Sequence, residues 1–274
     1  MSRIIMGLAS VAEPFVEENE HKRPSLLNVL GELRVPLEAS LFWLSALNHP
    51  FPRAELGEGK PVLLIPGFMA GDVTLAPMAA FLRRLGHSAD YSGIWVNSDC
   101  PRTTIDRASK QLLKMNRKHR SRVVVIGQSL GGLYARELSH RHPEEVERVI
   151  TLGSPIRMPR HTSHVAVAAV ARSMAMLRGK EKGCLTESCA CGIKIEERIA
   201  PVPTTVVYSR TDGIAHWESC VDPTGSPHVE NLEVMSSHCG MAVNPDVYRI
   251  IADKLAMRAR AKLGTPRLAA VASA

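Results

Sequence analysis

The sequence predicts an α/β fold in which a mainly parallel sheet is covered by helices on both faces. Short apolar runs typical of buried strands recur along the chain, and longer amphipathic segments typical of helices alternate with them. Gly, Pro or Asp marks most of the junctions between the two kinds of segment. Apolar residues make up 45% of the 274 residues, which is enough to bury such a sheet.

Strands are expected where short runs are apolar and rich in β-branched residues. The run Arg122-Val-Val-Val-Ile126 has the strongest signal, and the run at 61–65 is apolar throughout and stops at Pro66-Gly67. The signal at 88–91 is weak. In chain order, the expected strands are 61–65, 88–91, 122–126, 149–152, 204–208 and 232–235.

Helices are expected between these strands, and capping residues predict several of their ends. Asp72 is a favourable N-cap for a helix that Gly86 can end. Pro143 stops another helix, and Pro245 suits the first turn of the last one. The expected helices of this part are 72–85, 104–118, 130–142 and 245–262.

We expect three parts along the chain: residues 1–54, an α/β domain at 55–262, and a flexible C-terminal tail at 263–274. The first part combines a polar tail with helical segments near 26–33 and 37–47. Glu32, Arg34, Pro36 and Glu38 interrupt these segments, so they form a poor membrane span. We expect them to pack on the body of the protein rather than lie in a membrane interface.

An insertion is expected between the strands at 149–152 and 204–208. The intervening chain is about fifty residues long, whereas a simple crossover needs far fewer. We interpret residues 156–200 as a cap over the site, in which Val170, Met174 and Leu177 are candidates for lining a substrate pocket. Packing of this apolar stretch onto the body is the alternative.

The charge pattern does not favour a nucleic-acid protein. The formal net charge is +7, but the Lys and Arg residues are spread out, and aromatic residues make up only 4% of the chain. We expect a solvated basic surface, with contact to an anionic membrane as the alternative. The acidic residues that follow the first ten residues do not fit a secretory signal, so we expect a cytoplasmic protein, with membrane association left open.

A candidate nucleophile lies between the expected strand 122–126 and the helix after it. The segment Gly127-Gln-Ser129-Leu-Gly131 has the pattern G-x-S-x-G. A serine on such a tight turn presents its hydroxyl above the carboxyl edge of the sheet, and the backbone N–H of Leu130 can face a developing oxyanion. We therefore predict that Ser129 is a nucleophile, and an ordinary glycine-rich turn is the alternative.

A second oxyanion donor is expected from the turn after the strand 61–65. The turn reads Pro66-Gly67-Phe68-Met69, and the backbone N–H of Phe68 is the first candidate, before that of Met69. The side chains of Met69 and Gln128 are further candidates for lining the substrate pocket.

The candidate acid and base follow two later strands. Asp212 stands on an Asp-Gly turn after the strand 204–208, and His238 follows the strand 232–235. A carboxylate can fix the tautomer of an imidazole, which can then take the proton of a serine hydroxyl. Asp222 and His228 are the nearest rivals, but both lie inside a polar loop and neither follows a strand directly.

These segments resemble the lipase/esterase branch of the α/β-hydrolases, and they are most similar to a group of bacterial α/β-hydrolases. The resemblance covers residues 55–262 and, more loosely, 26–47. It implies the α/β-hydrolase fold, a triad of Ser129, Asp212 and His238, and hydrolysis that needs neither cofactor nor metal. The chain differs from many secreted lipases because Gln128, rather than His, precedes the candidate nucleophile.

The function expected from these residues is that of a serine hydrolase acting on a carboxylic ester of small-molecule or lipid-like character. Acyl transfer to an alcohol other than water would use the same residues. A non-catalytic binding protein on the same fold is the third hypothesis, and the presence of all three triad residues argues against it.

The cysteines give two further hypotheses. Cys184, Cys189 and Cys191 form a compact group that could bind a metal, form a disulfide or remain reduced. Cys220 and Cys239 flank the loops of Asp212 and His238, so we predict that they can form a disulfide under oxidising conditions. The sixth cysteine is Cys100.

Overall fold

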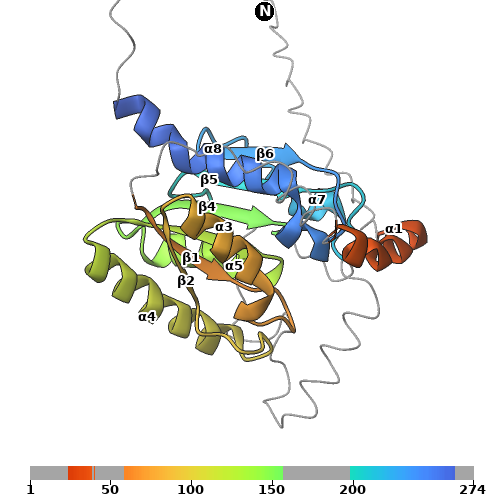
Figure 1. The fold of residues 1–274 in the computed structure, drawn as a ribbon, viewed down its shortest axis with the longest axis horizontal. Coiled ribbons are helices and arrows are strands. Elements are labelled where there is room, and N and C mark those ends of the chain that lie inside the picture. The colour runs from red at the N-terminus through yellow and green to blue at the C-terminus, as the bar shows by residue number, and fades with distance from the viewer. Residues whose placement is uncertain (1–23, 39, 41–58, 157–197, 263–274) are drawn as a thin grey trace, which may run out of the picture.

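One parallel sheet organises the part of the chain that the computed structural model describes, namely residues 24–38, 40, 59–156 and 198–262 (Figure 1). Its strands are β1 (Pro61–Ile65), β2 (Ser88–Tyr91), β3 (Val123–Gln128), β4 (Val146–Leu152), β5 (Thr204–Tyr208) and β6 (Val229–Glu233). Their order is β2-β1-β3-β4-β5-β6, and every neighbouring pair is parallel. The predicted fold class is therefore confirmed.

Helices cover both faces of the sheet. On one face, α3 (Ala76–Arg84) and α8 (Pro245–Lys262) pack against residues such as Val62 and Leu64. On the other face, α4 (Pro101–His119) and α5 (Leu130–Arg141) pack against residues such as Leu63 and Ile65. Alternate residues of β1 thus enter two separate cores, and all four side chains are fully buried. Burial of each contributes about 1.5–3 kcal/mol.

Shorter elements lie at the ends of these strands. They are η2 (Asp72–Leu75), α7 (Trp217–Cys220) and η3 (Cys239–Val243). The short helix α7 was not expected from the sequence. It follows the loop of Asp212, whereas η3 begins directly after His238.

Some predicted ends differ from those in the structure. The last strand is Val229–Glu233 rather than 232–235, because β6 pairs with β5 from Thr204↔Val229 to Tyr208↔Glu233. The prediction that Asp72 is an N-cap was wrong, because Gly71 occupies that position. The Asp72 carboxylate instead accepts hydrogen bonds from the backbone N–H groups of Gly93 and Ile94, at 2.8 and 2.9 Å.

The N-terminal segment, defined here as residues 24–38, contains α1 (Leu26–Gly31) and the 3-10 helix η1 (Glu32–Arg34). The hydroxyl oxygen of Ser25 caps α1 by accepting the backbone N–H of Asn28 at 3.2 Å. The segment contacts the body through polar side chains. Its leucine side chains are exposed, at Leu26, Leu27, Leu30, Leu33 and Leu37.

The predicted cap at 156–200 lies almost wholly outside the described residues, together with Val170, Met174 and Leu177. The tails at 1–23 and 263–274 also lie outside them, so the predicted boundaries of the three parts remain predictions. Across the described ranges, the helices all fall short of the length and apolar character that crossing a membrane requires.

Candidate active site

The strand order brings the predicted site residues to one edge of the sheet. The order reverses at β1, because β2 lies on one side of it and β3 on the other. In open parallel sheets, ligands bind outside the carboxyl ends of the strands at such a switch point. Phe68 follows β1 and Ser129 follows β3 at this edge, and Asp212 and His238 follow β5 and β6.

Ser129 lies in a strained turn between β3 and α5. Its backbone has φ 51° and ψ −122°, a conformation that costs a non-glycine residue on the order of 1–3 kcal/mol. Two backbone hydrogen bonds hold the turn: Ser129 N–H donates to the Leu152 carbonyl at 2.8 Å, and Gly132 N–H donates to the Ser129 carbonyl at 2.9 Å. The neighbouring Gly127 and Gly131 approach other backbone so closely that a methyl group on either would overlap it.

The turn after β1 lies beside Ser129. A methyl group on Gly67 would be 3.1 Å from the Ser129 Cβ atom. Buried Asn97 fixes this turn, because its side-chain Nδ2 donates to the Pro66 carbonyl at 2.8 Å and its backbone carbonyl accepts Met69 N–H at 2.9 Å. The Met69 N–H is therefore already engaged, which favours Phe68 as the second oxyanion donor.

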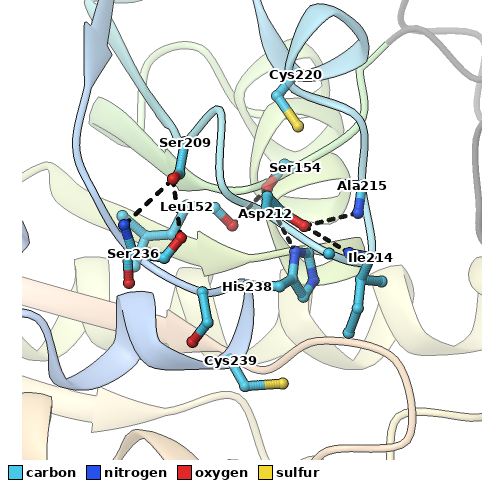
Figure 2. A network of polar contacts seen from close by, with 12 residues as sticks. Leu152, Ser154, Ser209, Asp212, Ile214, Ala215, Cys220, Ser236, His238 and Cys239 are labelled. Atoms are coloured by element: carbon cyan, nitrogen blue, oxygen red, sulfur yellow. Dashed lines mark hydrogen bonds and ion pairs between the residues drawn. The ribbon is translucent and has the colours of Figure 1, made fainter. Parts of the chain in front are cut away.

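Asp212 and His238 form a buried pair (Figure 2). The Asp212 Oδ2 atom lies 2.6 Å from His238 Nδ1, and the two residues are only 2% and 4% exposed. The other carboxylate oxygen, Oδ1, accepts the backbone N–H groups of Ile214 and Ala215, both at 2.8 Å. One oxygen thus fixes the carboxylate to its own loop, and the other holds the imidazole by its Nδ1 atom.

The surroundings of His238 favour its protonated form. Burial by itself lowers the pKa of this imidazole, but the charge and hydrogen bond of Asp212, with the charge of Glu32, raise the pKa above its ordinary value of 6.5. An imidazole that gains a proton during a reaction is stabilised by the same charges.

Further hydrogen bonds join the loops around this pair. The Ser209 hydroxyl donates to the Ser236 carbonyl at 2.8 Å and accepts the Ser236 N–H at 3.2 Å (Figure 2). Gln128, which the sequence suggested as a pocket residue, is buried, and its Nε2 donates to the His238 carbonyl at 3.2 Å. The residue before Ser129 is thereby tied to the loop that carries His238.

The structure places Ser129 and His238 on either side of the end of β4. The Ser129 N–H binds the carbonyl of Leu152, and the next residue, Gly153, lies against the His238 ring. Within the described part of the chain, no hydrogen bond joins the Ser129 hydroxyl to His238 itself. Catalytic hydrogen bonds are often long in the absence of substrate.

The two rival residues have other surroundings. The Asp222 carboxylate lies 2.7 Å from Arg136 Nη1 inside the protein and accepts hydrogen bonds from the hydroxyl and the N–H of Thr224. Burial opposes ionisation of Asp222, but the bonds from Thr224 and Arg136 lower its pKa below the ordinary value. His228 is exposed, and its backbone N–H donates to Ser226. Asp222 therefore forms a buried ion pair with α5 rather than with a histidine.

One side chain near the pair was missed in the sequence. The Glu32 carboxylate, from η1, accepts the backbone N–H of His238 at 2.7 Å and that of Gly213 at 3.0 Å. The available signal was the pair Glu32 and Glu38, two carboxylates inside an otherwise apolar helical segment. They were interpreted only as interruptions of a membrane span.

The predicted disulfide between Cys220 and Cys239 is absent from the structure, where both are free thiols. The two side chains lie on opposite sides of His238 (Figure 2). Burial, followed by the charge of Asp212, raises the pKa of the Cys220 thiol well above its usual range, whereas Cys239 is exposed. Cys100 is also a free thiol. The group Cys184, Cys189 and Cys191 lies outside the described residues.

Comparisons with known proteins agree with this architecture. The family model described as "PGAP1-like alpha/beta domain" matches residues 102–182. No curated protein sequence matches the chain significantly.

Several solved hydrolases share the fold. Lipase B of Aspergillus fumigatus is 20% identical with a TM-score of 0.55, over 74% of this chain and 55% of the lipase, so the chain spans about half the length of that protein. The lipase BlEst2 of Bacillus licheniformis is 16% identical with a TM-score of 0.54, over 76% of this chain and 94% of that lipase. The monoacylglycerol lipase of Paleococcus ferrophilus is 13% identical with a TM-score of 0.52, over 73% of this chain and 96% of that lipase. The chain therefore has the α/β-hydrolase fold, which it shares with lipases and esterases.

Proposed function

We propose that this protein is a serine hydrolase that cleaves carboxylic esters, with Ser129 as nucleophile, His238 as general base and Asp212 as its partner. The observation that carries the proposal is the buried contact of 2.6 Å between Asp212 Oδ2 and His238 Nδ1, at the sheet edge where Ser129 occupies a strained turn. This is the combination of groups that acyl transfer through a serine requires.

The proposed reaction has two halves. In the first, Ser129 Oγ attacks the acyl carbonyl while His238 Nε2 takes the hydroxyl proton, and the N–H groups of Phe68 and Leu130 donate to the oxyanion. The carbon–oxygen bond to the alcohol then breaks, and the alcohol leaves with the proton from His238. In the second half, water gives its proton to His238 and attacks the acyl-enzyme, which releases the acid and restores Ser129.

The Asp212 carboxylate supports both halves. Its Oδ1 atom receives two backbone N–H donors, which hold the carboxylate in place, and Oδ2 remains available to the Nδ1–H of His238. The imidazole is therefore held with Nε2 as the proton acceptor, and the imidazolium that forms is stabilised by a fixed negative charge.

The substrate class is proposed to be an ester of small-molecule or lipid-like character. The similar folds named above include two lipases and a monoacylglycerol lipase. We also propose that Val170, Met174 and Leu177 line the acyl pocket, since they belong to an apolar stretch that leaves the sheet next to the strand of Ser129.

The test is a panel of p-nitrophenyl esters of rising chain length, assayed with the wild type, Ser129→Ala and the control Ser121→Ala. Ser121 is exposed before β3, at the opposite edge of the sheet. The wild type and the control should hydrolyse the esters alike. Ser129→Ala should be slower by at least about 10⁴-fold. Full activity of Ser129→Ala, or none in the wild type across the panel, would reject the proposed function.

A further inference from the structure

Glu32 joins the loop of Asp212 to the loop of His238. Its Oε1 atom accepts two backbone N–H groups, from His238 at 2.7 Å and from Gly213 at 3.0 Å. Its Oε2 atom accepts the N–H of Cys239 at 3.3 Å. The Glu32 carboxylate therefore accepts the backbone N–H groups of Gly213, His238 and Cys239, although Glu32 lies 206 positions before His238 in the chain.

Other polar side chains of the N-terminal segment hold it in this place. The guanidinium Nη2 of Arg34 donates to the Thr211 hydroxyl at 2.7 Å, and Asn28 Nδ2 donates to the Arg210 carbonyl at 2.9 Å. Glu38 accepts the backbone N–H of Ser237 at 3.0 Å and also the Ser237 hydroxyl. The segment is thus bound to both loops at several points, and Glu32 lies where the two loops meet.

The two loops have small residues where the segment approaches them. A methyl group on Gly213 would overlap the Asn28 carbonyl, and one on Gly240 would overlap the Glu38 carboxylate. At Gly213 the neighbouring atoms are backbone, so only glycine leaves room there, whereas at Gly240 the Glu38 carboxylate would have to move. The fit between the segment and the loops is therefore specific, and Glu32 reaches its backbone donors because of it.

We propose that Glu32 is a positioning residue for the reaction, which fixes the His238 loop against the Asp212 loop. Its charge adds an electrostatic part, because it is one of the charges that raise the pKa of His238. This inference rests on the proposed function for its catalytic part. The electrostatic part concerns only Glu32 and His238, and it can be measured without turnover.

The charged and titratable groups around His238 lie on several elements. Asp212, on the loop after β5, has the largest effect of any charge on the pKa of His238, and Glu32 has the next. Within the described residues, other titratable groups on the two loops and the N-terminal segment are Glu38, which accepts Ser237 N–H, Arg34, which donates to Thr211, and the thiols of Cys220 and Cys239. Arg34 and Glu38 pair with each other at 3.0 Å, and burial raises the pKa of the Cys220 thiol well above its usual range. Glu32 is therefore the charge that can be removed without disturbing the bond at Nδ1.

A purely structural role makes a different prediction. If Glu32 only anchored the N-terminal segment, any change that loosens the segment would alter the pKa of His238 as much as the substitution of Glu32 does. Asn28→Ala is the matched control, because it removes an anchoring bond to the Arg210 carbonyl and no charge. Glu144→Gln controls for charge, since Glu144 is exposed before β4, at the opposite edge of the sheet.

The experiment measures the pKa of His238 by NMR titration of the imidazole in a Ser129→Ala background, with and without Glu32→Gln. The amide oxygen of Gln can still accept a backbone N–H, but the charge is lost. We expect the pKa of His238 to fall by about half a unit to one unit. With Ser129 present, Glu32→Gln should lower kcat about tenfold with little change in KM, and the acid limb of the pH profile should move to lower pH. Both control variants should leave the pKa of His238 unchanged.

A second variant guards against a change that merely perturbs folding. Glu32→Asp keeps the charge and shortens the side chain, so it should lower kcat but keep the pKa of His238 near that of the parent protein. The proposal is overturned if Glu32→Gln leaves this pKa unchanged, or if Glu32→Asp and Asn28→Ala lower it as much as Glu32→Gln does. The two proposals can also fail separately. If the wild type hydrolyses no ester but Glu32→Gln still lowers the pKa of His238, the proposed function is rejected and the electrostatic coupling between Glu32 and His238 is established.

Discussion

Gly153, at the end of β4, lies against the imidazole of His238. A methyl group on Gly153 would be 3.2 Å from His238 Nδ1 and 3.1 Å from Asp212 Oδ2, closer than most such contacts. The backbone of Gly153 also has φ +55°, a conformation that favours glycine. The Asp212–His238 pair therefore packs against a glycine, where even a methyl group would require the pair to shift by a few tenths of an ångström.

Gly153→Ala should impair catalysis, because the added methyl pushes the imidazole away from Asp212. Gly225→Ala is the matched control: Gly225 has φ +60°, but a methyl group there would meet nothing within 4 Å. Each variant should lose about 1–2 kcal/mol of stability through backbone strain. Only Gly153→Ala should lower kcat, by about 10²-fold, in assays corrected for folded protein. Equal activity in the two variants would show that the contact at Gly153 does not matter for the reaction.

Asp212→Asn and Asp222→Asn should separate catalysis from stability. An amide at position 212 favours the wrong tautomer of His238, so kcat should drop about 10⁴-fold with little change in the unfolding midpoint. An amide at position 222 leaves buried Arg136 without its partner, which should cost about 3–5 kcal/mol of stability. Activity per folded molecule and urea denaturation measure the two effects. A greater loss of activity in Asp222→Asn would mean that Asp212 is not the acid of the triad.

The pH dependence of kcat/KM should report the raised pKa of His238. His238, the proposed general base, must be neutral to accept a proton, so activity should be lost as the pH falls through its pKa in the folded protein. Since the charges of Asp212 and Glu32 outweigh the effect of burial and raise that pKa, the midpoint of the acid limb should lie above 6.5. Two esters of different reactivity should give the same midpoint if it reports protonation of the enzyme. A common midpoint at or below 6.5 would contradict this description of the site.

The sequence predicted the edge strand β2 at its observed bounds, 88–91, but misplaced β6, the strand at the other edge. β1, β3 and β5 are buried on both faces, so their apolar runs are continuous and easily recognised. β6 ends the sheet in the described part of the chain and is half exposed, so its apolar pattern is weak and its backbone pairing with β5 sets its position. Asp212 could still be chosen as a candidate from its Asp-Gly turn after a strand, and His238 from its place between the last expected strand and the last helix.

The contacts that support the site could not be predicted in the same way. Gln128 donates to the carbonyl of His238 from 110 positions earlier in the chain, and Glu32 accepts the N–H of His238 from 206 positions earlier. Neither contact follows from local periodicity or from turn-forming residues, because the partners are backbone groups that any residue would present. Their geometry depends on how the N-terminal segment and β3 meet the His238 loop in three dimensions.

Covalent labelling by a fluorophosphonate tests the central claim most directly, because the probe reacts with a serine hydroxyl only when a neighbouring base and an oxyanion site activate it. Peptide mapping by mass spectrometry after labelling identifies the modified residue. We predict a single modified serine, Ser129, with labelling abolished in Ser129→Ala and slowed strongly in His238→Ala, while Ser121→Ala labels like the wild type. Labelling at another serine, or undiminished labelling of Ser129 in His238→Ala, would contradict the account of a nucleophile activated by His238.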